Sequence, residues 1–137
     1  MNLRLHRYHM PTRHPFTISR GTTTVQTTLL VELEQDGVVG YGEAVEVSFY
    51  DATIDSTVAA LEQERDAIES FTFSEPVSFW SFMSVRLAHS PAAQCGLDCA
   101  AYDLWGKLAD KPVWKLWELD PDRACPTDYT IGIDTID

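Results

Sequence analysis

Apolar and polar residues alternate along much of the first 45 positions, and this period of two predicts β-strands. The alternation is short at about 3–9 and longer at about 24–34, where β-branched residues are frequent. Gln35–Gly37 then provides a hairpin turn before a third strand at about 38–43. We therefore expect a three-stranded antiparallel meander in which a loop over Pro15–Thr24 joins the first two strands.

Beyond the third strand the apolar period lengthens to about 3.6 residues, which predicts helices. We expect them at about 55–69, 76–88, 91–109 and 112–117. The third is the most regular, because Pro91 suits a first helical turn. Ala93, Gly96 and Ala100 form a small-residue seam on it that permits close packing. The sequence thus predicts an α+β fold, with the meander followed by a layer of three to four helices.

Composition limits the partners and the compartment. The 137 residues, 45% of them hydrophobic, are enough for one domain with a core. Ten basic against 21 acidic residues give a net charge of −11, which argues against nucleic acid and against an anionic membrane as partners. The N-terminal segment MNLRLHRYHM lacks the apolar core of a signal peptide, so we expect a cytoplasmic location.

The three cysteines, Cys95, Cys99 and Cys125, argue against a disulfide framework because their number is odd. Cys95 and Cys99 are one helical turn apart among small residues, where cysteine commonly serves as a small buried hydrophobe. Further Cys or His residues at zinc-finger spacing are missing from the sequence. We therefore expect Cys95 and Cys99 in the core.

Four segments carry a family resemblance: PFTISRG (Pro15–Gly21), VGYGEA (Val39–Ala44), the helical AAQCGLDCAAYDLWGKLADKPVWKL (Ala92–Leu116) and TDYTIGID (Thr127–Asp134). The long helical segment is the most specific, with its pattern A-x-x-G-L-D-x-A-x-x-D-L-x-G-K. Over nearly its whole length the chain resembles the N-terminal capping domain of the enolase superfamily, in the mandelate racemase/muconate lactonizing branch. The last segment is similar to the first barrel strand of dipeptide epimerases. One departure is Trp117–Asp120, where the family commonly carries a leucine followed by two glycines.

The resemblance implies a capping domain over 1–118, a linker at 119–126 and the first strand of a (β/α)8 barrel at 127–137. Enzymes of this family abstract a proton next to a carboxylate with the help of Mg2+. Their metal ligands and acid/base groups lie on a barrel of about 250 residues. We therefore interpret the chain as a truncated piece without catalytic or metal-binding residues, inactive alone, with Mg2+ in the full-length parent.

The resemblance also implies substrate contacts from the cap. Arg20, in the Pro15–Thr24 loop, is a candidate for pairing with a substrate carboxylate, because a planar guanidinium suits such a group. The alternative, a solvated arginine at a turn, stays open. Tyr50 lines the substrate pocket or packs the cap. Thr130 matches a position near the substrate, but threonine is also an ordinary strand residue.

We interpret the parent as an L-Ala-D/L-Glu-type dipeptide epimerase, an isomerase acting on a small carboxylate or dipeptide substrate. A muconate cycloisomerase or an o-succinylbenzoate synthase would carry a similar cap, and Arg20 alone does not separate them. The rival from another class is a stand-alone, non-catalytic binding module. A cap without its barrel exposes apolar surface and an edge strand, so we expect the chain to self-associate.

Overall fold

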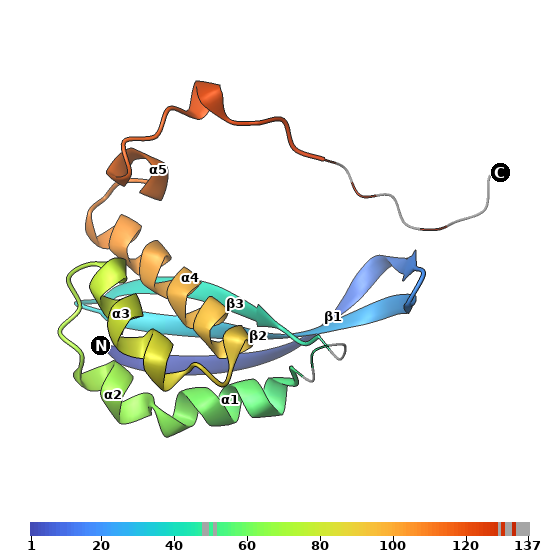
Figure 1. Cartoon of the computed structure of the whole chain (residues 1–137), viewed down its shortest axis with the longest axis horizontal. Helices are drawn as coiled ribbons and strands as arrows, with labels where there is room; N and C mark the ends of the chain where they lie inside the picture. The colour runs from blue at the N-terminus through green and yellow to red at the C-terminus, as the bar shows by residue number, and fades with distance from the viewer. Residues whose placement is uncertain (48–49, 51, 129, 131–132, 134–137) are drawn as a thin grey trace.

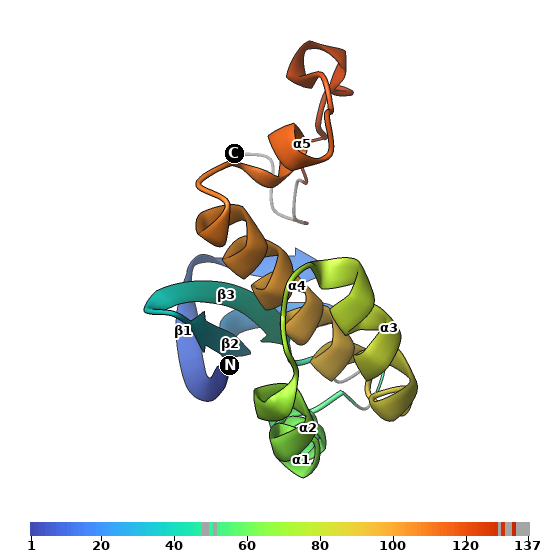
Figure 2. The same ribbon diagram turned by 90° about the vertical axis from the view of Figure 1, so that its left-hand side faces the viewer.

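The computed structural model describes residues 1–47, 50, 52–128, 130 and 133. Its architecture has two layers, with a three-stranded antiparallel sheet of order β1-β2-β3 covered by helices on one face (Figures 1 and 2). The strands are β1 (Asn2–Ile18), β2 (Gly21–Gln35) and β3 (Val38–Val45). The helices are α1 (Ile54–Gln63), α2 (Arg65–Ser70), α3 (Pro76–Arg86), α4 (Pro91–Leu108), α5 (Val113–Leu116) and the 3-10 turn η2 (Pro121–Arg123). The predicted α+β fold is confirmed.

The first two strands are longer than the sequence predicts, and the expected loop over Pro15–Thr24 is wrong. This segment is the far end of the β1–β2 hairpin, where Ile18 pairs with Gly21 across a two-residue turn. The alternation that predicts the first strand ends near residue 9, and prolines follow it at 11 and 15. The structure instead accommodates them in an irregularity of β1, where the register shifts between Pro11 and Phe16.

The second hairpin forms as predicted. Asp36 and Gly37 have φ values of 55° and 79°, both in the left-handed region that a tight two-residue hairpin turn requires. Gln35 and Val38 pair directly on either side of them. The backbone of this turn is further held by Glu34, whose carboxylate accepts a hydrogen bond from the Gly37 N–H at 2.9 Å.

The single helix expected at about 55–69 is two helices, α1 and α2, with Glu64 between them. Thr53 begins α1 by accepting a hydrogen bond from the Ser56 N–H at 3.1 Å. In α2, Arg65 donates to the backbone oxygen of Leu3 on β1 at 2.7 Å. This contact ties α2 to the first strand, while α1 packs against β2 and β3.

Helix α4 lies directly on the backbone of β3, and glycines make this possible. A Cβ atom at Gly42 would overlap the backbone of α4 at Gly96 and Ala100. A Cβ atom at Gly40 would overlap Ala100 and Leu104 in the same way. The small-residue seam predicted from the sequence therefore faces the two glycines of β3. The buried residues of β2 continue the core below it: Leu29, Val31 and Leu33.

The C-terminal part follows α4 through α5 and η2 and then runs back towards the far end of the β1–β2 hairpin (Figure 1). The predicted helix at 112–117 is the four-residue α5. The predicted barrel strand at 127–137 lies largely outside the described residues, which include 127, 128, 130 and 133 of that range. It stays a prediction. No helix in the described part of the chain is long and apolar enough to cross a bilayer.

Candidate functional site

Three segments carry the residues that the sequence selects: the far end of the β1–β2 hairpin, the β3–α1 connection and the C-terminal segment. Arg20 forms the hairpin turn with Ser19 and is exposed. Gly21 follows with a φ of 144°, a value that favours glycine. Because β1 and β2 pair up to this turn, Arg20 is presented by a hairpin of defined register rather than by an irregular loop.

The C-terminal segment contacts this hairpin. The Ile133 N–H donates a hydrogen bond to the Thr17 backbone oxygen at 2.8 Å. Thr130, three residues before Ile133, is exposed. The segment that carries Thr130 and the hairpin that carries Arg20 are thus joined by a backbone hydrogen bond.

Tyr50 lies in a tight turn between β3 and α1. Val47 and Ala52 close this turn as an isolated bridge, with the Val47 N–H donating to the Ala52 oxygen at 3.0 Å. The Tyr50 N–H donates to the Val47 oxygen at 3.0 Å. The side chain is 75% exposed, so burial in the cap does not account for the tyrosine.

Tyr50 borders an apolar cavity of about 680 Å³. The cavity lies between β3, the β3–α1 turn and the first turn of α4. Its lining is Glu43, Ala44, Val45, Val47, Tyr50, Ala52, Pro91, Ala92 and Cys95. A volume of this size is in the range of small-molecule sites, about 300–1,000 Å³. The single carboxylate, Glu43, accepts a hydrogen bond from the Thr28 hydroxyl at 2.6 Å.

The cysteines of α4 are not core residues, so the expectation for Cys95 and Cys99 is wrong. Both are exposed. They lie next to the seam, and a Cβ atom at Gly42 of β3 would approach the Cβ atom of Cys99. Partial burial, followed by the neighbouring Cys95 and Asp98, raises the pKa of the Cys99 thiol.

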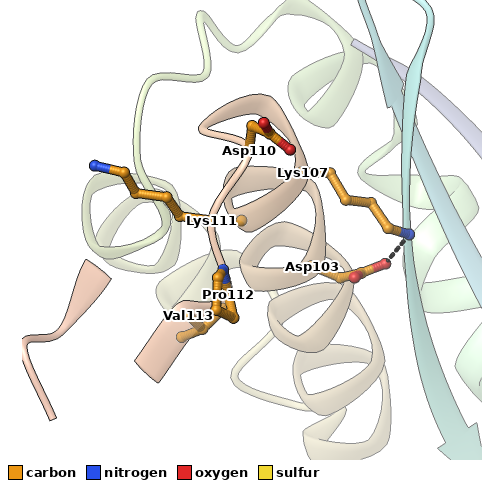
Figure 3. Close-up of a pocket in the computed structure, with 7 residues that line it drawn as sticks. Asp103, Lys107, Asp110, Lys111, Pro112 and Val113 are labelled. Atoms are coloured by element: carbon orange, nitrogen blue, oxygen red, sulfur yellow. Dashed lines mark hydrogen bonds and ion pairs between the residues drawn. The ribbon is translucent and has the colours of Figure 1, made fainter. Parts of the chain in front are cut away.

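A second hollow, of about 340 Å³, lies at the end of α4 (Figure 3). Lys107 points to Asp103, and its Nζ lies 2.6 Å from Oδ2 of that carboxylate. Lys111 points away from both residues (Figure 3). Lys107 and Asp103 therefore pair with each other, and Lys111 points elsewhere. These charged groups do not converge on a ligand.

A further charged cluster lies on the sheet face that points away from the helices. Glu32 accepts hydrogen bonds from Arg4 and from His6, whose Nε2 lies 2.9 Å from Oε2. Burial raises the pKa of the Glu32 carboxyl, but these two partners outweigh burial and leave the pKa below its ordinary value. The cluster is satisfied within the sheet, which marks it as a structural feature.

The described residues do not fit a Mg2+ site. Among them, no group of three or more His, Cys, Asp or Glu side chains is arranged to hold a metal ion. Mg2+ prefers several oxygen ligands in octahedral geometry. The candidate residues Arg20, Tyr50 and Thr130 and the apolar cavity beside Tyr50 are instead of a kind that suits binding and orientation of an organic ligand.

A three-stranded meander with a helical layer on one face and a hairpin reaching past the sheet defines this α+β capping domain. The chain belongs to the family of the mandelate racemase/muconate lactonizing enzyme N-terminal domain, which matches residues 3–117. The family assigned by resemblance is confirmed.

Dipeptide epimerases are prominent among its relatives. An L-Ala-D/L-amino acid epimerase of Maribacter sp. is 40% identical over 137 residues, which is all of this chain and 40% of that protein. A hydrophobic dipeptide epimerase of Enterococcus faecalis is 33% identical over 124 residues, 89% of this chain and 35% of that protein. The chain spans about 40% of the length of the curated relatives it matches.

Solved structures of dipeptide epimerases share the fold of this chain. The dipeptide epimerase from E. faecalis complexed with Mg and the dipeptide L-Leu-L-Tyr has a TM-score of 0.71 and 29% identity, over 84% of this chain and 33% of that chain. The dipeptide epimerase from Cytophaga hutchinsonii complexed with Mg and D-Ala-L-Val has a TM-score of 0.80 over 96% of this chain and 36% of that chain. At 23% identity, the second likeness shows the shared fold.

Sequence reasoning selected Arg20, Tyr50 and Thr130 as candidates but missed the cavity beside Tyr50. Its walls come from two segments that are far apart in the chain, the end of β3 with the following turn and the start of α4. A partial signal exists in the sequence, since Val45 and Val47 continue the alternation of β3 beyond its predicted end. The matching apolar residues, Pro91 and Ala92, carry no such signal because they also suit the first turn of any helix.

Proposed function

We propose that this domain is the substrate-selecting cap of a Mg2+-dependent dipeptide epimerase. Arg20 pairs with a carboxylate of the dipeptide, Tyr50 lines the pocket beside an apolar side chain of the substrate, and Thr130 contacts the substrate from the C-terminal segment. The substrate is a dipeptide, and the reaction is inversion at a carbon next to a carboxylate.

The observation that carries this proposal is the backbone hydrogen bond from the Ile133 N–H to the Thr17 oxygen, which links the segment of Thr130 to the hairpin of Arg20. The cavity beside Tyr50 adds an apolar surface, which suits dipeptides with hydrophobic side chains. The relatives named as dipeptide epimerases support the same substrate class.

The side chains of this domain indicate which part of the reaction it can perform. Because the described residues offer no metal site, we place Mg2+ and the proton-transferring groups of the full-length enzyme outside this domain. The residues of the cap bind and orient the substrate and exclude water. An arginine on a hairpin turn is suited to that role, since its charge and planar fork recognise a carboxylate without taking part in proton transfer.

A chimera tests the proposal. This chain replaces the matching 137 residues of the Maribacter L-Ala-D/L-amino acid epimerase, and exchange of the dipeptide α-proton is followed in D2O by mass spectrometry. We expect exchange by the chimera and none by the chain alone. Exchange by the chain alone would contradict the proposal. So would a folded chimera that binds Mg2+ and processes a muconate or succinylbenzoate substrate but no dipeptide.

A further inference from the structure

A pair of thiols on the surface of α4 is left unused by the proposed function. Cys95 and Cys99 lie one helical turn apart and are both exposed. Because the two residues are four apart on one helix, their side chains lie on the same face of α4. Cys95 also borders the apolar cavity beside Tyr50. Cys125, which is exposed in the segment after η2, is more than twenty residues away along the chain.

The four-residue spacing of Cys95 and Cys99 limits which bond or bridging atom can link their sulfurs. Residues four apart on a helix have Cβ atoms about 5–6 Å apart. A disulfide needs Cβ atoms about 3.5–4.5 Å apart, so direct oxidation would distort α4. A single atom that bonds both sulfurs at about 2.3 Å, the length of a metal–thiolate bond, fits the same spacing without distortion. The geometry therefore disfavours a disulfide and favours a bridging soft atom.

We propose that Cys95 and Cys99 form a dithiol site for trivalent organic arsenic, with the organic group placed in the cavity that Cys95 borders. The hydrated arsinoxide R–As(OH)2 loses two As–O bonds and gains two As–S bonds. The two hydroxyl groups leave as water with the two thiol protons. Arsenic stays trivalent and the sulfurs are not oxidised, so the exchange needs no further reactant.

The fate of the two thiol protons distinguishes binding of the arsenical from binding of a divalent cation. A divalent ion binds thiolates, so its binding must release the thiol protons into solution. Burial and the neighbouring Cys95 raise the pKa of the Cys99 thiol, which makes that release harder at neutral pH. The arsinoxide carries its own proton acceptors and forms a neutral product. The pair is therefore expected to prefer the arsenical over Zn2+.

The test uses phenylarsine oxide with an excess of glutathione, which removes arsenic from single thiols. Intact-mass spectrometry then counts the arsenic that remains on the chain. We expect one phenylarsenic group on the wild-type chain and on Cys125→Ala, and at least tenfold less on Cys95→Ala and on Cys99→Ala. Far-UV circular dichroism confirms that the variants keep their helices, since both positions are exposed and alanine favours helix.

Three outcomes would overturn the inference. These are the absence of a retained arsenic group on the folded wild type, equal retention by either single variant of the pair, or ready formation of a Cys95–Cys99 disulfide with diamide. A methylarsenical serves as the control for the cavity. We expect the phenyl compound to be retained more strongly than the methyl compound, and equal retention would overturn the placement of the organic group.

Discussion

Asp103 on α4 accepts a hydrogen bond from the backbone N–H of Tyr41 on β3, with 2.8 Å between nitrogen and oxygen. One turn further along, Lys107 donates to the Val39 backbone oxygen at 2.9 Å. The two side chains also pair with each other. Two charged residues of the helix therefore satisfy backbone groups on the outer edge of the sheet, which is the part of a sheet most exposed to unwanted pairing.

This edge contact predicts the effect of removing Asp103. Asp103→Ala leaves the Tyr41 N–H without this acceptor and breaks the ion pair with Lys107. We expect a loss of about 1–2 kcal/mol in the free energy of unfolding, measured by urea denaturation. Asp103→Asn keeps an acceptor oxygen and should lose less. Equal stability of wild type and Asp103→Ala would show that the edge contact contributes nothing.

The close approach of α4 to β3 makes a second prediction. Gly42→Ala places a methyl group where the helix backbone at Gly96 and Ala100 already lies. The helix must move, and we expect a loss of about 1–3 kcal/mol, as for other overpacked cores. The control is Gly37→Asn, at an open position with a φ of 79° that asparagine tolerates, where the loss should stay below about 1 kcal/mol. A stable Gly42→Ala variant would contradict the described packing.

The lowered pKa values of Glu32 and Glu69 predict that the fold loses stability in acid. The partners of Glu32 outweigh its burial and lower its pKa, and the Leu3 N–H lowers the pKa of Glu69. A lowered pKa in the folded state means that each group stabilises the fold above its ordinary pKa of 4.5 and ceases to do so as the pH falls through the folded value. Stability should therefore decrease as the pH falls below about 5.

Urea denaturation at several pH values measures this effect. Glu32→Gln should be less stable at neutral pH and should lose less stability on acidification than the wild type. Asp66→Asn on α2 serves as the control position. A Glu32→Gln variant whose stability declines with pH as steeply as that of the wild type would rule out the role given to Glu32.

Self-association remains a prediction, and the structure indicates where to test it. Trp114, Trp117 and Leu119 are 40–53% exposed near the end of the helical layer. Trp117 packs against the ring of Tyr102, so Trp114→Ser combined with Leu119→Ser disturbs the fold less. We expect the wild type to associate in a light-scattering dilution series and this double variant to be more monomeric. Val85→Ser, an exposed apolar position on α3, is the control. A wild-type chain that is monomeric at high concentration would contradict the prediction.

The parts of the fold that the sequence predicts are those set by local chemistry. Asp36–Gly37 forms its turn because few other residues adopt positive φ, and the glycines of β3 imply a close neighbour before that neighbour is known. The hairpin beyond Pro11 was missed because the irregularity that accommodates a proline depends on the partner strand. The exposure of Cys95 and Cys99 was missed because it depends on which side of α4 packs against the sheet, and the spacing of residues along one helix does not determine that.

The central claim is that Arg20 selects the substrate by its carboxylate, and steady-state kinetics of the Maribacter chimera tests it most directly. Arg20→Ala is compared with Arg20→Lys and with Arg13→Ala, an exposed arginine in the irregular part of the same hairpin. The account predicts that Arg20→Ala raises KM for dipeptides at least tenfold with little change in kcat, as expected when a charge-assisted hydrogen bond to the substrate is lost. It predicts a partial rise for Arg20→Lys and no change for Arg13→Ala. An unchanged KM in the folded Arg20→Ala chimera would contradict it.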